Sequence, residues 1–230
     1  MDFLFIFSGD TSYIEILPSW RPDEAPELRV DVLRHMRILP NFVTEEEESG
    51  LLAEVEPHLK RMRYEYDHWD NAIEGYRETE RGKWNEQNEG VISRVREVAF
   101  APNAELLPYV HVLDLAAAGH IKPHVDAVRV SHLGNLMAPE QMYRRQYSHN
   151  SRPSWRYGAQ PTARWEISLW NALDALLERR SLYIMSGVAR YSFSHAVLGG
   201  EHSMWKGKRL PRTRRIAVIC REQPRPEDRQ

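Results

Sequence analysis

Apolar residues follow a helical period in the first half of this 230-residue chain and form short alternating runs in the second half. Thr44 and Glu47 fit the reciprocal hydrogen bonds of a capping box, so we expect a helix to begin there and to run to about residue 60. A second helix is expected over 85–100. Each segment has one apolar face, formed by Leu51, Leu52, Val55 and Leu59 in the first and by Val91, Ile92, Val95 and Val98 in the second.

After Pro108 the pattern changes to short runs of β-branched and aromatic residues separated by glycine and proline. Strands are expected over residues 109–115, 120–130, 181–186, 189–198 and 215–220. Many short strands with turn residues between them predict a sandwich or a jelly roll. The predicted fold class is therefore mainly β (α+β), with N-terminal helices flanking the β core.

Three segments do not fit this plan. Residues 18–31 place prolines among charged residues, which indicates a linker. The interval 131–165 is polar, contains three prolines and has no convincing strand, while 165–177 fits a helix face about as well as a strand. A jelly roll that lacks a strand would expose an unpaired sheet edge beside its pocket.

Composition narrows the class of protein. With 42% hydrophobic residues, 28% charged residues and a formal net charge of -2, the chain is neither disordered nor a polybasic nucleic-acid binder. No apolar run approaches the roughly 20 residues of a membrane span, so no membrane partner is expected. The single cysteine, Cys220, excludes an internal disulfide framework. The apolar run after Asp2 is too short for a secretory signal, and the N-terminus shows no clear transit peptide.

Candidate metal ligands lie on one of the predicted strands. His124 and Asp126 are two residues apart, so their side chains point to the same face and can reach one ion. His195 offers a third ligand on a later segment. Two imidazoles and one carboxylate on one face of an octahedron are typical of non-haem Fe(II) oxygenases. A second His-x-Asp pair, His68 and Asp70, has no strand alternation around it, so we interpret it as structural.

A basic element near the C-terminus could bind an anion beside such an iron site. Alternation in the last predicted strand places four residues on one face: Arg215, Ala217, Ile219 and Arg221. Inward-facing guanidinium groups are costly unless each meets an anion, and a guanidinium binds a carboxylate through two parallel hydrogen bonds. The dicarboxylate 2-oxoglutarate would supply that anion, and its keto-acid end could occupy two iron positions and leave the third for dioxygen. Alternatively, Arg215 is a solvated residue of the basic run that precedes it.

The order of these residues is more specific than any one of them. The signature HxD…H…RxxxxxR is matched by His124, Asp126, His195, Arg215 and Arg221, and the chain resembles the AlkB family of Fe(II)/2-oxoglutarate-dependent dioxygenases. The resemblance implies a double-stranded β-helix, or jelly roll, with helices packed outside it. It also implies that Tyr183 hydrogen-bonds 2-oxoglutarate, that Arg215 pairs with the distal carboxylate, and that Arg221 lies at the far edge of the same pocket, beyond Ala217.

Four stretches narrow the resemblance to the subfamily of the seventh AlkB homologue, its mitochondrial member: residues 63–81, 111–126, 181–198 and 214–221. The dioxygenase domain is expected over 37–224. Residues 1–36 would be an N-terminal extension, 225–230 a C-terminal tail, and 131–165 an atypical insertion or an altered segment.

The resemblance also implies a biological setting. It points to the mitochondrial matrix, to damage-induced programmed necrosis and to fatty-acid metabolism, with hydroxylation or demethylation of a protein or of methylated mitochondrial RNA. Aromatic residues where the family's base-binding lid might lie are expected in the core instead; they are Tyr64, Tyr66, Trp69, Tyr76 and Trp84. The near-neutral charge argues against strong backbone-driven RNA binding.

Two alternative functions remain open at this point. A weakly active or non-catalytic jelly-roll scaffold would bind metal and 2-oxoglutarate and be stabilised by both without turnover. A cupin-type metal binder unrelated to 2-oxoglutarate would be stabilised by metal alone.

Overall fold

The computed structural model describes residues 9–20, 23, 26–67, 72–125, 131–138, 143–149, 172–200 and 202–223, of which 131–138 and 143–149 are described by their backbone only. Its helical elements are η1 (Thr11–Tyr13), α1 (Pro26–His35), α2 (Glu45–Leu59), α3 (Glu86–Ala99) and α4 (Gly187–Tyr191). The strands of the first half are β1 (Ile14–Ile16), β2 (Met36–Leu39), β3 (Ile73–Arg81) and β4 (Val110–His124). Those of the second half are β5 (Ser131–Ala138), β6 (Tyr143–His149), β7 (Ala172–Leu177), β8 (Leu182–Met185), β9 (Phe193–Val197), β10 (Met204–Trp205), β11 (Lys208–Arg209) and β12 (Arg215–Glu222).

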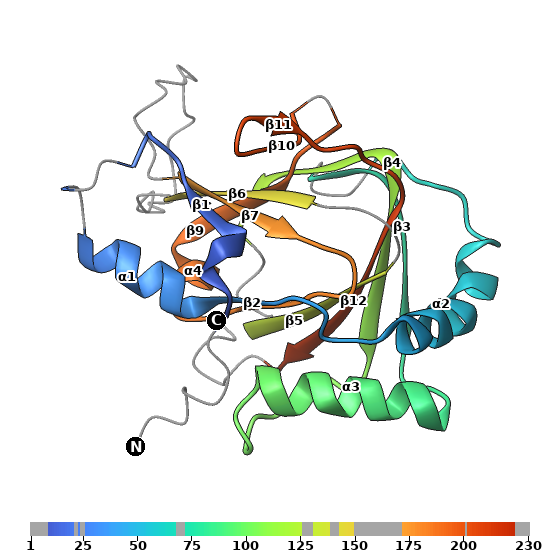
Figure 1. Ribbon diagram of the computed structural model, residues 1–230. Coiled ribbons are helices and arrows are strands. Elements are labelled where there is room, and N and C mark those ends of the chain that lie inside the picture. The colour runs from blue at the N-terminus through green and yellow to red at the C-terminus, as the bar shows by residue number, and fades with distance from the viewer. Residues whose placement is uncertain are drawn as a thin grey trace, which may run out of the picture.

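Ten of the described strands form one antiparallel sheet, which folds over a shared core (Figure 1). The order of the strands in this sheet differs from their order along the chain. Hydrogen-bonded neighbours follow the order β1-β7-β6-β9-β4-β12-β5-β8-β2, with β3 pairing β4 and a separate β10–β11 hairpin. Side chains from the β7 and β9 part meet those from the β4, β12 and β8 part in one buried cluster, which includes Leu173, Ala175, Phe193, Leu113, Leu115, Ala217, Ile219 and Tyr183. The two parts are thus the two layers of the predicted jelly roll.

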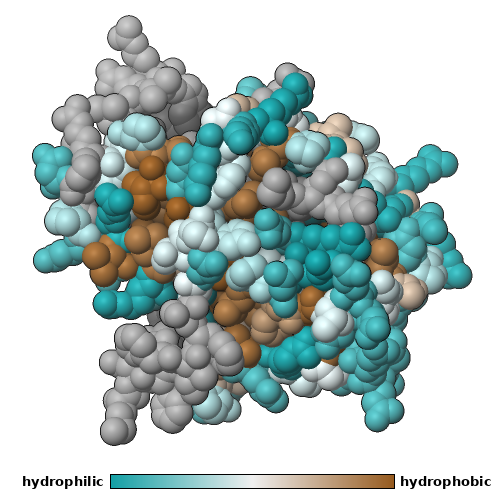
Figure 2. All heavy atoms as spheres, viewed as in Figure 1, coloured by the Kyte–Doolittle hydropathy of each residue, from teal (hydrophilic) through white to brown (hydrophobic). Residues whose placement is uncertain are grey.

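Helices α2 and α3 cover the outer face of the layer that contains β4 and β12 (Figure 1). Both predicted helices are confirmed, and α2 begins with both hydrogen bonds of the capping box between Thr44 and Glu47. The surface over α2, at the right of the view, is largely hydrophilic (Figure 2). Each helix therefore presents a polar face outward and turns its apolar face onto the sheet.

The prediction of no strand over 131–165 is wrong for its first part. β5 lies between β12 and β8, and β6 lies between β7 and β9, so both are interior strands of the sheet. Their pairing on both sides outweighs the weak alternation of their sequence, because strand formation depends on neighbours more than on intrinsic preference. The ambiguous segment 165–177 ends in the strand β7, and 150–171 lies outside the described residues.

The predicted linker over 18–31 is also wrong. Trp20 is buried in the core, and α1 begins at Pro26, whose missing N–H and fixed φ suit the first position of a helix. Because β1 pairs with β7, the sheet and core include residues that precede residue 37, where the sequence places the start of the domain. The predicted tail at 225–230 lies outside the described residues.

Three predicted strands differ in their bounds. The stretches predicted over 109–115 and 120–130 are one continuous strand, β4, because Gly119 lies within the strand beside a bulge of β3 and does not form a turn. The stretch predicted over 189–198 begins as α4 and becomes the strand β9 only at Phe193. Among the helices that the structure describes, none is long and apolar enough to cross a membrane.

Candidate metal and cosubstrate site

Two of the predicted metal ligands lie side by side. Strands β4 and β9 are antiparallel, and His124 is the register partner of His195. The centroids of the two imidazole rings are 4.2 Å apart, and the ring planes are tilted by 57°. Because neighbouring strands fix these positions, two imidazole rings that are far apart in the sequence lie next to each other.

A backbone hydrogen bond sets the tautomer of His124. Its Nδ1 lies 2.9 Å from the carbonyl oxygen of Lys122, which only accepts hydrogen bonds, so Nδ1 carries the proton. The lone pair is then on Nε2, the form in which a histidine binds a metal while its other nitrogen is held by a carbonyl. His195 is 1% exposed, so the second imidazole is shielded from water. The donor set of this pair therefore fits a divalent transition metal.

The third predicted ligand, Asp126, lies outside the described residues, which end at Val125 on this strand. The described part of the chain contains no cluster of three or more histidine, cysteine or acidic side chains suited to a metal. The carboxylate ligand therefore stays a prediction. The second His-x-Asp pair, at 68–70, also lies outside the described residues.

The last strand, β12, is buried on both faces. Ala217 and Ile219 belong to the core between the two layers, whereas Val218 and Cys220 pack beneath α3, and burial raises the pKa of the Cys220 thiol to about 11. Arg215 has the same parity as Ala217, so it faces the interior, and it is only 3% exposed. The alternative in which Arg215 is a solvated residue of the basic run is therefore wrong.

Tyr183 reaches the same interior from β8. It is 1% exposed and belongs to the core cluster that contains Ala217 and Ile219. Residue 135 of β5 is the register partner of Ile219 on one side and of Tyr183 on the other. Tyr183 therefore lies level with Ile219 across the sheet, two strands away. Arg215 and Tyr183 thus lie on one inner surface of the sheet.

Arg221 lies at the opposite end of this surface from Arg215. Its Nη2 donates to Nδ1 of His111 at 2.7 Å, and the Nε2–H of His111 then donates to Oε2 of Glu78 at 2.9 Å. Neither His111 nor Glu78 is among the site residues predicted from the sequence. The alternation that places His111 on the same face of β4 as Leu113 was the available signal.

The aromatic residues expected in the core have different environments. Tyr76 is buried in the core, whereas Trp84 is partly buried beneath the helices. Tyr64 donates a hydrogen bond to Asp114, but Tyr66 is 65% exposed, so the core prediction is wrong for Tyr66. Trp69 lies outside the described residues.

Two mammalian proteins resemble this chain along most of its length, whereas no family model matches it. Alpha-ketoglutarate-dependent dioxygenase alkB homolog 7, mitochondrial, of Mus musculus is 45% identical over 190 residues, which are 80% of this chain and 77% of that protein. The Bos taurus protein of the same name is 43% identical over 192 residues, 81% of this chain and 78% of the relative.

Solved structures share the fold at low sequence identity. OsALKBH1 has a TM-score of 0.52 at 13% identity and covers 81% of this chain and 97% of its own. A Pseudomonas putida prolyl-4-hydroxylase has a TM-score of 0.52 at 12% identity, with 83% and 93% covered. The epimerase SnoN, solved with Fe3+, alpha ketoglutarate and nogalamycin RO, has a TM-score of 0.53 at 14% identity, with 85% and 84% covered. The jelly-roll fold predicted from the sequence is therefore confirmed.

Proposed function

Because this chain belongs to the alkB homolog 7 family of alpha-ketoglutarate-dependent dioxygenases, we propose that it is an Fe(II)- and 2-oxoglutarate-dependent oxygenase of mitochondria. The observation that carries the proposal is the pairing of His124 with His195, whose ring centroids lie 4.2 Å apart. When bound, iron and 2-oxoglutarate supply the oxidation of a substrate C–H bond by dioxygen, with succinate and carbon dioxide as the products of the cosubstrate.

The residues of the chain hold the metal in place. His124 would bind it through Nε2, because the carbonyl of Lys122 holds the proton of Nδ1. His195 would supply the second nitrogen from its buried position on β9, and Asp126 would supply the carboxylate. Three ligands on one side leave the remaining positions for the cosubstrate and dioxygen.

The interior of the sheet holds the cosubstrate. Arg215 would pair with the distal carboxylate of 2-oxoglutarate through two hydrogen bonds, and the hydroxyl of Tyr183 would donate another. The small side chain of Ala217 lies beside Arg215 on this face, and Arg221, held by His111, would mark its far edge. Because the surrounding core is apolar, water is excluded and these polar contacts are strengthened.

We further propose that the primary substrate is a protein, with methylated mitochondrial RNA as the alternative. The formal net charge of -2 supports a protein, because RNA-binding proteins gain much of their affinity from basic side chains on phosphates. Roles in damage-induced necrosis and in fatty-acid metabolism belong to the same proposal. Mass spectrometry of both substrate classes after incubation with the reconstituted protein distinguishes them by a gain of oxygen or a loss of methyl.

The test of the central proposal is the substitution His195→Ala. It should reduce succinate formation from 2-oxoglutarate to the level without protein and should weaken binding of Mn(II), measured by titration calorimetry. His58→Ala, which removes an exposed imidazole from α2, is the matched control and should leave both measurements unchanged. Full succinate formation by the His195 variant would refute the proposal.

A further inference from the structure

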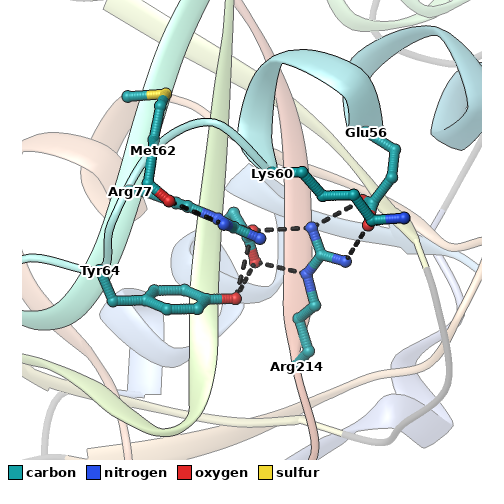
Figure 3. Close-up of polar contacts among 7 residues, drawn as sticks. Glu56, Lys60, Met62, Tyr64, Arg77 and Arg214 are labelled. Carbon is teal, nitrogen blue, oxygen red and sulfur yellow. Dashed lines mark hydrogen bonds and ion pairs between the residues drawn. The ribbon is translucent and has the colours of Figure 1, made fainter.

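A cluster of charged side chains lies on the outer face of the sheet and includes Arg214, the residue that precedes β12 (Figure 3). Its centre is Asp114 of β4, which is fully buried. The carboxylate of Asp114 accepts from Nε of Arg77 at 2.6 Å, from Nε of Arg214 at 2.9 Å and from Nη2 of Arg214 at 2.8 Å. We call Asp114, Arg77, Arg214, Tyr64 and Glu56 the Asp114 cluster.

Arg214 also reaches a helix. Its Nη1 donates to Oε1 of Glu56 at 2.9 Å, so one guanidinium binds a carboxylate of β4 and a carboxylate of α2 (Figure 3). Burial opposes the charge on Arg214, but the hydrogen bonds with Asp114 and Glu56 outweigh it and raise the pKa of this arginine. The same contact lowers the pKa of Glu56. Arg214 is therefore charged and held in one direction.

The position of Arg214 in the chain connects this cluster to the interior. β12 begins at Arg215, and the pairing of Arg215 with Leu115 is the first in its ladder with β4. The ladder therefore does not hold the residues just before Arg215. Because successive residues of a strand point to opposite faces, a guanidinium fixed on the outer face at 214 directs residue 215 inward.

The apolar pattern of β12 does not fix this direction. Both faces of the strand are buried, with Ala217 and Ile219 in one cluster and Val218 and Cys220 in another. A hydrophobic pattern fixes the register of a strand by separating a buried face from a solvent face, and residues 215–220 of β12 have no solvent face. A one-residue shift that moved Arg214 into the inner position of Arg215 would place Thr213 beside the carboxylates, which would lose their doubly bonded partner. The Asp114 cluster thus opposes such a shift.

We propose that Arg214 is a positioning residue for the cosubstrate: bound by Asp114 and Glu56 on the outer face, it holds Arg215 toward the distal carboxylate of 2-oxoglutarate. This inference rests on the proposed function of Arg215. Two consecutive arginines then have separate tasks, one as an anchor on the outside and the other as a ligand of the cosubstrate on the inside.

The test is Arg214→Ala in the full-length protein loaded with Mn(II). Asp114 keeps its hydrogen bonds to Arg77 and Tyr64, so the core retains a partnered carboxylate and the variant should fold. Calorimetry compares 2-oxoglutarate with pyruvate, a keto acid that lacks the distal carboxylate. We expect about tenfold weaker binding of 2-oxoglutarate, which corresponds to the loss of about one hydrogen bond to a charged group, and unchanged binding of pyruvate and of Mn(II).

Arg94→Ala is the matched control. Arg94 makes two hydrogen bonds, at 2.8 and 2.7 Å, to Glu47 of the same helix α2 and a third to the carbonyl oxygen of Phe42, and neither partner belongs to β12. This variant loses a comparable ion pair and should keep the wild-type ratio of the two affinities. A loss of stability alone would therefore leave the ratio unchanged, whereas a loss of positioning lowers it.

Arg215→Ala separates failure of this inference from failure of the proposed function. If it lowers the ratio of 2-oxoglutarate to pyruvate affinity and Arg214→Ala does not, the positioning inference is overturned and the role of Arg215 stands. If both variants keep the wild-type ratio, the role of Arg215 itself is refuted. Equal weakening of both ligands in Arg214→Ala also overturns the inference.

Discussion

Strand β4 meets different surroundings at its two ends. From Val110 to Leu115 it pairs in unbroken register with β3 on one side, and from His111 to Leu115 with β12 on the other. The buried charge of Asp114 is bound by Arg77 of β3 and by Arg214, the residue before β12. Near His124 the pairing with β9 is interrupted by a shift in register. The regular end pairs with the strand proposed to hold the cosubstrate, whereas the irregular end carries the predicted metal ligand His124.

A bulge separates the two ends. The register between β3 and β4 shifts between Glu74 and Tyr76, where Gly75 has a φ of 69°, a conformation that favours glycine. A Cβ on Gly119 would lie 2.6 Å from the carbonyl oxygen of Gly75, so the two backbones approach too closely for a side chain. Bulges re-aim side chains, and they are frequent next to active sites. The regular pairing at one end of β4 and the bulge that precedes the predicted ligand His124 are therefore separate features of one strand.

Removal of the charge at the regular end should have the largest effect on stability. Asp114→Ala removes the carboxylate partner of the buried Arg77 and leaves Arg214 only Glu56, and a broken buried pair costs about 3–5 kcal/mol of unfolding free energy. Urea unfolding measures this loss. Asp31→Ala, which removes an exposed partner of Arg34 at 3.6 Å, is the control and should change stability by less than about 1 kcal/mol. Equal small losses in both variants would contradict a special role for this end.

A side chain at the bulge should act mainly on the irregular end. Gly119→Ala forces the two backbones apart, at a cost of about 1–3 kcal/mol, and should weaken Mn(II) binding because His124 follows on the same strand. Gly90→Ala is a matched control, since a Cβ there meets nothing within 4 Å and the helix α3 should gain about 0.5–1 kcal/mol. Urea unfolding measures the change in stability, and titration with Mn(II) measures the change in metal affinity. Unchanged metal affinity in the Gly119 variant would show that the bulge does not affect the metal site.

Low pH should reduce the free energy of unfolding by a smaller amount than these substitutions, because it protonates Glu56 of the Asp114 cluster. The hydrogen bond from Arg214 lowers the pKa of Glu56 from its ordinary value of 4.5, so the folded state binds fewer protons there than the unfolded chain. The stabilisation is complete above pH 4.5 and is lost as the pH falls through the lower pKa of the folded state. Glu56→Gln should therefore reduce the acid sensitivity by about 1 kcal/mol or less, measured by urea unfolding at successive pH values. Identical pH profiles for the two proteins would argue against this linkage.

Local signals in the sequence were enough for the capped helices and for the order of the candidate ligands. The capping box of Thr44 and Glu47 forms within one helical turn, so neighbouring residues determine it. The metal and cosubstrate residues follow a recognisable order, and the structure pairs His124 with His195 and buries Arg215. Asp126 lies outside the described residues, so the full ligand set stays a prediction.

Other features depend on contacts between distant residues. The strands β5 and β6 form because each is paired on both sides, although their own sequence shows little alternation. The Asp114 cluster joins a helix, two strands and the residue before β12, and no short window of sequence contains those partners.

The sequence by itself determined the starts of α2 and α3, the jelly-roll class and the candidate residues, because capping, periodicity and the order of a motif can be read along the chain. Only the tertiary structure excluded a solvated Arg215 and decided which segments complete the sheet. Those choices depend on buried charges and strand pairs that form only after distant segments pack together.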